Sequence, residues 1–142
     1  MKRVELSLAA LLVGTGMASA AMAADVTVTL TGVKPAGGQV LVSLQTRDQF
    51  MKPAGANGAM GPAEAGAQTL VVKDVAPGDY AVMVMHDADS NWTMTMGPDG
   101  KPAEGWGMSG HAPDGRKPTF DDVKFTVPAG GGAVSVALVY PQ

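Results

Sequence analysis

The chain has 142 residues, a net charge of −3 at pH 7 and no cysteine. This length suits one domain with a single core, and a mildly acidic chain without a basic cluster lacks the charged surface that binds nucleic acid. The absence of cysteine excludes disulfides, thiolate metal sites and cysteine nucleophiles. Stability must therefore come from buried apolar surface and from hydrogen bonding between strands.

The N-terminus has the pattern of a secretory signal peptide over residues 1–23. Basic residues at positions 2 and 3 precede an apolar stretch that ends at about Met17, and Ala21-Met22-Ala23 has the small-x-small pattern of a cleavage site. Ala18-Ser19-Ala20 offers an alternative cleavage site. The apolar stretch is shorter than the roughly 20 residues that span a bilayer. We therefore expect a periplasmic or secreted protein, cleaved near Ala23, whose mature form (24–142) is one domain without a membrane anchor.

The rest of the chain alternates short apolar runs of period two with turns rich in glycine and proline. In the run 25–33, valines and a leucine occupy one face and threonines the other, which is typical of a half-buried strand. The turn at 35–38 predicts a hairpin between this run and the next. Further strands are predicted at 39–46, 67–75, 80–87, 121–129 and 133–140. Such a series predicts an all-β fold, an antiparallel β-sandwich of about seven strands.

Two stretches lack a strand pattern. Residues 47–66 are rich in glycine, alanine and proline and predict a loop, with one helical turn around 48–52. Residues 90–119 form a long connection that contains both tryptophans, Trp92 and Trp106. Because a loop of this length in a compact domain is usually functional or disordered, we expect any local function to lie in the second stretch.

Three stretches together resemble a known bacterial family. They are DVAPGDYAVMVMHDADSN (74–91), PAEGWGMSG (102–110) and PTFDDVKFTV (118–127). The chain is similar in these stretches to the exported domain-of-unknown-function family numbered 2141, and the Pro-Gly-Asp-Tyr turn looks like that of transthyretin-like and carboxypeptidase-regulatory-like sandwiches. The resemblance implies an exported transthyretin/immunoglobulin-like sandwich and supplies no established activity. The chain departs from the family pattern at Trp92, where the acidic loop usually carries glycine.

Asp87, Asp89 and Asn91 have the alternate spacing of a calcium-binding loop, which directs oxygen atoms at one hard cation. A loop of the EF-hand kind also needs glycine at its sixth position and glutamate at its twelfth, which here are Trp92 and Pro98. The alternative is a turn whose carboxylates accept hydrogen bonds from nearby backbone N–H groups.

A second possible metal site is a copper site of thioethers and imidazoles, since thioethers suit Cu(I). The period of a strand puts Met83 and Met85 on the face opposite His86, and methionine is also an ordinary core residue. Core packing is therefore the alternative for these two methionines. The copper candidates are Met83, Met85, Met94, Met96, Met108, His86 and His111.

Catalysis has few candidates in this sequence. There is no nucleophile elbow, HExxH pair or phosphate-binding loop. We therefore expect no enzyme. The side chains able to act as acid, base or nucleophile are His86, Asp87, Glu104, Ser109 and His111.

The ligand-binding prediction rests on the aromatic part of the long connection. The segment EGWGMSGH places Glu104, Trp106 and His111 on a glycine-rich flexible loop, with Trp92 in the same connection. The alternative is that Trp106 covers an open end of the sandwich.

The leading hypothesis is a non-enzymatic binding or accessory module that uses loop 87–111 to hold a small ligand, a glycan or a protein. The runner-up is a protein that binds calcium or copper, and no other cofactor is expected.

Overall fold

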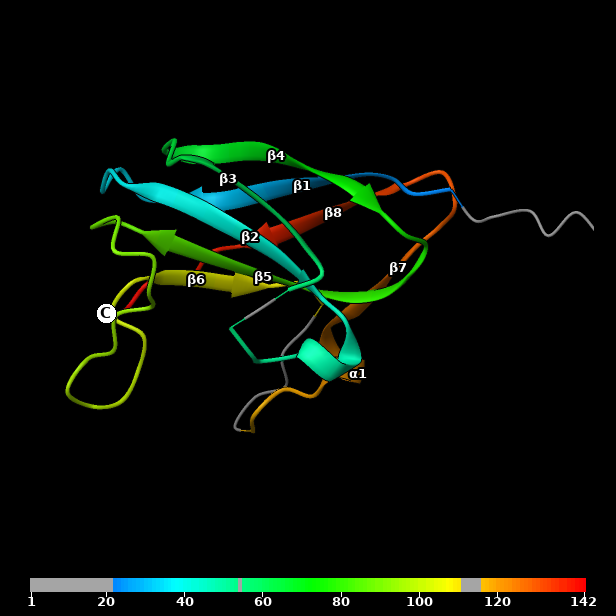
Figure 1. The fold of residues 1–142 in the computed structure, drawn as a ribbon. Coiled ribbons are helices and arrows are strands. Elements are labelled where there is room, and N and C mark those ends of the chain that lie inside the picture. Colours follow the sequence, from blue (N-terminus) through cyan, green and yellow to red (C-terminus); the bar gives the residue numbers. More distant parts are fainter. Residues whose placement is uncertain (1–21, 54, 111–115) are drawn as a thin grey trace, which may run out of the picture.

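The chain folds as two β-sheets packed face to face in a computed structural model that describes residues 22–53, 55–110 and 116–142 (Figure 1). The predicted all-β sandwich is confirmed. The strands are β1 (Ala24–Val33), β2 (Gln39–Gln45), β3 (Asn57–Pro62), β4 (Gly66–Val75), β5 (Gly78–Asp87), β6 (Gly105–Met108), β7 (Lys124–Val127) and β8 (Gly132–Ala137). Two helical turns, η1 (Arg47–Gln49) and α1 (Phe120–Val123), flank the sheets.

Neither of these described helices has the length and apolar character needed to cross a bilayer. The predicted signal segment, up to residue 21, lies outside the described residues.

The smaller sheet has the order β4-β1-β8 and the larger one the order β3-β2-β5-β6, with β7 pairing to the first part of β5. Adjacent strands are antiparallel except β1 and β8, which are parallel. This parallel pair departs from a fully antiparallel sandwich. It arises because the chain passes from β7 in the larger sheet to β8 in the smaller one, where β8 runs alongside β1 in the same direction.

The predicted hairpin between the first two strands is wrong. β1 lies in the smaller sheet and β2 in the larger one, so residues 34–38 cross between the sheets (Figure 1). Both strands have one apolar face, and these faces bury against a shared core instead of lying side by side in one sheet. The alternation of residues specifies a buried face and leaves the strand's partner open.

The core between the sheets consists mainly of valine and leucine. Val28 and Leu30 of β1 and Val40 and Leu44 of β2 are fully buried, and burial of each such side chain contributes roughly 1.5–3 kcal/mol. Valine is branched at Cβ and suits a strand. Among the described residues, the main buried cluster contains no methionine.

Three segments differ from the prediction. The expected loop 47–66 contains β3, an edge strand whose glycines and proline hide the strand pattern. The first residues of the expected strand 121–129 instead form α1, because the Thr119 amide and hydroxyl both donate to Asp122, as in a capping box. The expected connection 90–119 contains β6.

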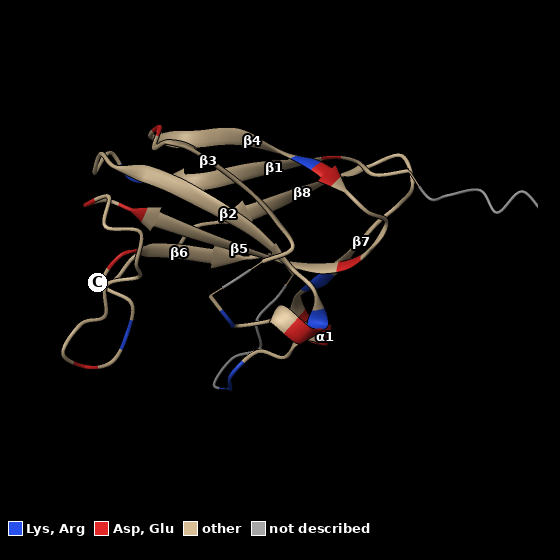
Figure 2. Ribbon diagram, in the orientation of Figure 1, with Lys and Arg blue, Asp and Glu red and all other residues tan. Residues whose placement is uncertain are grey.

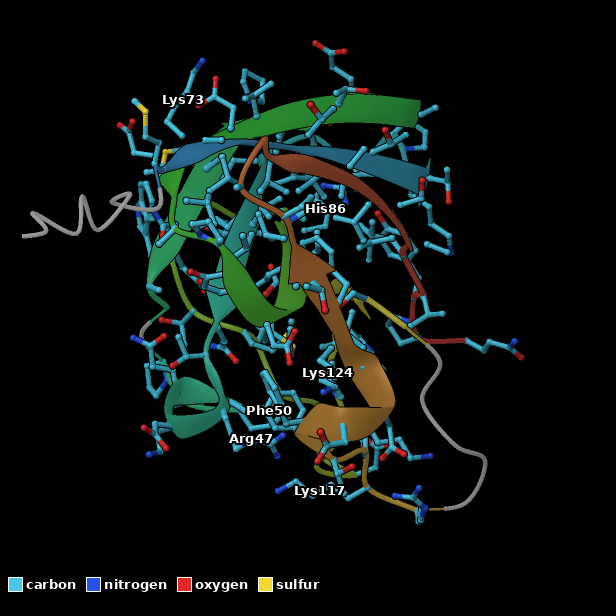
Figure 3. The ribbon with its side chains drawn as sticks, turned by 90° about the vertical axis from the view of Figure 1, so that its right-hand side faces the viewer. Arg47, Phe50, Lys73, His86, Lys117 and Lys124 are labelled. Carbon is cyan, nitrogen blue, oxygen red and sulfur yellow. The ribbon has the colours of Figure 1, made fainter. Side chains whose placement is uncertain are left out.

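His86 lies between the two sheets with no exposed surface (Figure 3). Its Nε2 is 2.7 Å from the carbonyl oxygen of Gly37 and its Nδ1 is 2.6 Å from the hydroxyl of Tyr140. Because a carbonyl only accepts, Nε2 carries the proton and the Tyr140 hydroxyl donates to Nδ1. The same hydroxyl accepts from the Lys34 amide at 3.0 Å. These bonds connect β5 to the crossing segment and to the C-terminus.

Substitution Tyr140→Phe should lower the free energy of unfolding by about 1–3 kcal/mol, because it leaves a buried imidazole nitrogen without a donor. Urea denaturation followed by circular dichroism measures this. Tyr80→Phe is the matched control, since its hydroxyl makes a single hydrogen bond within the described part of the chain, to the Ala76 carbonyl. We expect the control to lose about 0.5–1.5 kcal/mol. A loss for Tyr140→Phe no larger than that of the control contradicts the role given to the His86–Tyr140 pair.

Candidate ligand-binding groove

The outer face of the larger sheet carries a row of apolar side chains across four strands. Leu41 of β2 lies opposite Met60 of β3 on one side and opposite Met85 of β5 on the other. Met85 in turn lies opposite Trp106 of β6. Because directly opposite residues in antiparallel strands project to the same side, these four side chains share one face.

The next row on this face continues the apolar surface. Met83 lies opposite Ser43 of β2 and opposite Met108 of β6. Met83, Met85 and Met108 are half-buried on this outer face, so the alternative of core packing for Met83 and Met85 is wrong. The three methionines form one patch beside Trp106, called here the methionine block.

Loops at both ends turn this face into a groove of about 1170 Å³. The loop after β5 contributes Trp92, and the segment after η1 contributes Pro53. The ribbon of β2, β5 and β6 carries almost no charged residue along its length, and the charges gather at strand ends and in loops (Figure 2). Seven of the ten methionines line the groove: Met51, Met60, Met83, Met85, Met94, Met96 and Met108.

Several groove residues are unusually exposed for their size. Trp92 is 59% exposed, and Met96, Met60 and Met51 are 54%, 50% and 47% exposed. They are four of the seven large hydrophobic residues that are exposed in the described part of the chain. Large exposed apolar side chains gathered on one surface mark sites of interaction.

At one end of the molecule, the segment around η1 packs against α1. The rings of Phe50 and Phe120 meet edge to face with centroids 5.9 Å apart. The Arg47 guanidinium lies 4.7 Å from the centroid of the Phe120 ring and forms a bidentate pair with Asp121. Figure 3 shows Arg47 and Phe50 side by side at this end of the molecule. These contacts fix the segment that carries Met51.

The carboxylate of Asp87 ends β5 and organises the turn that follows it. Its Oδ1 accepts the Asn91 amide at 3.0 Å. Its Oδ2 accepts the Trp92 amide and the Gln39 side-chain amide, both at 2.9 Å. Asp87 is fully buried, and these donors supply the partners that a buried carboxylate requires.

The pKa of Asp87 reflects two opposing effects. Desolvation by burial raises it, and the hydrogen bonds donated by Gln39, Trp92 and Asn91 lower it. The hydrogen bonds prevail, so the pKa lies below the ordinary value for aspartate. The carboxylate is therefore held in its charged form in the folded state.

Glu104 supports the other part of the same loop. Its Oε1 accepts the Ala88 amide at 3.1 Å and its Oε2 accepts the Thr95 amide at 3.0 Å. Glu104 is buried. Asp87 and Glu104 together thus hold the backbone of residues 88–95.

The acidic residues of this loop meet each other as well as the backbone. Carboxylate oxygens of Asp87, Asp89 and Glu104 lie within 4.8 Å of one another. The Asn91 amide donates to Asp89, and the Asn91 side-chain oxygen accepts the Thr93 amide. This pattern of backbone contacts favours the turn that caps its own N–H groups over a calcium loop built on Asp87, Asp89 and Asn91.

Trp92 adopts a backbone conformation that large side chains rarely use. Its φ is +66°, in the left-handed region, where a bulky residue other than glycine is strained. This strain costs of the order of 1–3 kcal/mol, which the hydrogen bonds to Asp87 and Glu104 offset. The conformation explains why a glycine suits this position and shows that the tryptophan is tolerated there against a local preference.

The structure brings together part of the predicted ligand site. Trp92 and Trp106 both line the groove, while Glu104 lies beneath the loop and bonds to its backbone. His111 lies outside the described residues. His86 faces the core, and Ser109 is buried, with its hydroxyl donating to the Val123 carbonyl.

The segment around Trp106 is a strand and not the flexible loop predicted above, so Trp106 does not cover an open end of the sandwich. In Gly-Trp-Gly-Met the bulky residues face the groove, and the glycines face inward. A Cβ on Gly107 would lie 2.6 Å from the carbonyl oxygen of Ala137, so only glycine permits this approach. The alternation of glycine with a large residue is the signal that identifies this strand. Residue spacing does not identify Leu41 and Met60 as groove residues, because their partners come from strands distant in sequence.

One comparison with known proteins gives a match. A family model described as "Uncharacterized protein conserved in bacteria (DUF2141)" matches residues 28–135. No curated protein matches the chain, and no solved structure matches it.

Substitution Asp87→Asn should lower the free energy of unfolding at pH 7 by about 1–3 kcal/mol, because an amide cannot accept all three donors. A lowered folded-state pKa stabilises the protein above the unfolded value of about 3.9, and this stabilisation is lost as the pH falls through the folded value. The difference between wild type and variant should therefore shrink between pH 7 and pH 3. Urea denaturation at both pH values measures it.

Asp99→Asn serves as the control, because among the described residues this exposed carboxylate contacts just Lys101, whose amide donates to it and whose ammonium lies 3.8 Å away. Its effect should stay within about 0.5 kcal/mol at pH 7. An Asp87→Asn effect that is equal at pH 7 and pH 3 would contradict the role of the charged carboxylate.

Proposed function

The chain belongs to the uncharacterised bacterial family DUF2141, and we propose that it is a non-enzymatic binding module for an apolar ligand. The ligand lies in the groove on the outer face of the five-stranded sheet. The signal-peptide pattern over residues 1–23 supports a place of action in the periplasm or outside the cell.

The placement of methionine is the observation that carries this proposal. The described core cluster is built from valine, leucine and tyrosine, whereas the groove is lined by seven methionines and two tryptophans. Methionine is flexible and polarisable and fits ligands of irregular shape. Tryptophan adds a large rigid surface. A protein that needed only a stable sheet would have no reason to keep these side chains exposed.

The backbone strain at Trp92 also supports the proposal that the groove binds a ligand. Strained backbone persists where the surrounding structure compensates for it, and it gathers at functional sites. Here the buried carboxylates of Asp87 and Glu104 hold the loop in the conformation that presents the indole to the groove. The acidic residues thus act by positioning Trp92.

The groove also indicates what the ligand is like. Its volume of about 1170 Å³ lies just above the roughly 300–1,000 Å³ common for small-molecule sites. Of the charged residues that line it, Arg116 is paired with Asp122, and Lys52 donates to the Asp48 carbonyl. With these charges engaged, an uncharged apolar molecule suits the groove better than a glycan, which needs many polar partners.

Substitution Trp92→Gly tests the proposal, because it separates binding from stability. The purified protein should bind the uncharged apolar dye N-phenyl-1-naphthylamine with enhanced, blue-shifted emission. The variant should bind it at least about tenfold more weakly, which corresponds to about 1.4 kcal/mol. Its free energy of unfolding should stay equal or rise by up to about 2 kcal/mol, because relief of about 1–3 kcal/mol of backbone strain at φ +66° outweighs the roughly 0.5–1 kcal/mol that glycine costs in chain entropy.

Val71→Ser is the control, because Val71 is 41% exposed on β4, in the other sheet. Dye binding by this variant should equal that of the wild type. Failure of the wild type to bind the dye, or unchanged binding by Trp92→Gly, would refute the groove as the binding surface.

A further inference from the structure

We propose that the methionine block, Met83, Met85 and Met108, is a binding site for the soft monovalent cation Cu(I), with Trp106 beside the ion. This site lies inside the groove and takes a ligand of a different class. It therefore does not depend on the binding of an apolar molecule.

The positions of the four side chains are fixed by the sheet. Met83 lies directly opposite Met108, and Met85 directly opposite Trp106, on adjacent antiparallel strands. Opposite residues have Cβ atoms about 4.5–5.5 Å apart, and next-but-one residues on a strand lie about 6.8 Å apart. The four residues thus occupy the corners of a small quadrilateral on one face. Each methionine has three rotatable bonds, which allow its sulfur to turn toward the middle.

The chemistry of these side chains selects the cation. Thioethers are neutral soft ligands that suit Cu(I), whereas calcium and magnesium require oxygen ligands. Trp106 offers an aromatic face that attracts a cation. His86 takes no part, because it lies on the opposite face of β5 and both its ring nitrogens are already hydrogen-bonded. The sequence offers both methionines and histidines as copper ligands. The structure leaves the methionine thioethers on the sheet as the candidate ligands and removes His86.

The space available at the positions of the methionine block does not by itself require methionine, because leucine would also fit. Leu41 stands in the same row, between Met60 and Met85, and shows that leucine fits this face. Met94 and Met96 of the neighbouring loop line the same groove, so the groove holds further thioethers outside the block. The sheet supplies the fixed ligands and the open side of the groove supplies access.

Silver ion tests the site, because Ag(I) is a soft cation of the same charge that does not change oxidation state under these conditions. The full chain, labelled with ¹³C at the methionine methyl groups, is titrated with silver nitrate in chloride-free buffer. One equivalent should shift the methyl resonances of Met83, Met85 and Met108 and quench tryptophan fluorescence. Met60, which lies in the groove outside the block, should not respond.

The double variant Met83→Leu/Met108→Leu keeps the volume and apolar character of the block. It should bind Ag(I) at least about tenfold more weakly than the wild type, which corresponds to about 1.4 kcal/mol. Met60→Leu, a methionine of the same groove outside the block, is the matched control and should bind as the wild type does. Met85→Leu alone should also weaken binding and replaces the double variant if that does not fold.

Undiminished silver binding by the leucine variants overturns the site, as do shifts confined to methionines outside the block. The dye titration separates this result from the proposed function. Leucine variants that still bind the dye but lose silver support both ideas. A wild type that binds silver but not the dye refutes the apolar-ligand proposal and leaves the copper site standing.

Discussion

The hydrogen bonding of the buried Asp87 carboxylate is the interaction on which the groove depends. One carboxylate accepts three donors, from β2, from Asn91 and from Trp92. Without these three hydrogen bonds, the Asp87 carboxylate at the end of β5 would be a buried charge with no compensating donor. Nothing would then offset the backbone strain of the loop that follows. With Glu104 holding Ala88 and Thr95, the loop becomes a fixed wall of the groove.

β5 links this loop to the rest of the molecule, because its two faces serve different purposes. Val82 and Val84 point inward to the core, and the buried His86 on the same face ties the crossing segment and the C-terminus to the strand. Met83 and Met85 point outward to the groove. One strand thus carries both the stability of the sandwich and its candidate site. The inward valines of β5 stabilise the core, and its outward methionines line the candidate site.

The sequence predicts the sandwich well, because the period-two valines, leucines and threonines of the longer strands specify which faces are buried. It does not predict which sheet each strand joins: β1 and β2 look like a hairpin, yet they face each other across the core. It also misses β3 and β6, whose glycines lower strand propensity but are required where other chain segments approach closely.

The candidate site was only partly predictable for a related reason. Trp92 and Trp106 stand out in the sequence as the two tryptophans of a long connection, and both reach the groove. Their neighbours, Leu41 and Met60, come from strands far away in sequence. Asp87 has a spacing that suggests a metal ligand, and its position in space gives it a role in holding Trp92. Such roles depend on three-dimensional contacts that residue spacing does not contain.

A crystal structure of the protein with N-phenyl-1-naphthylamine bound would test whether the groove is the binding surface. We expect the dye on the outer face of the five-stranded sheet, in contact with Trp92 and Met85, with the Asp87 turn unchanged. A dye molecule bound elsewhere, with Trp92 and the methionine block free, would contradict it.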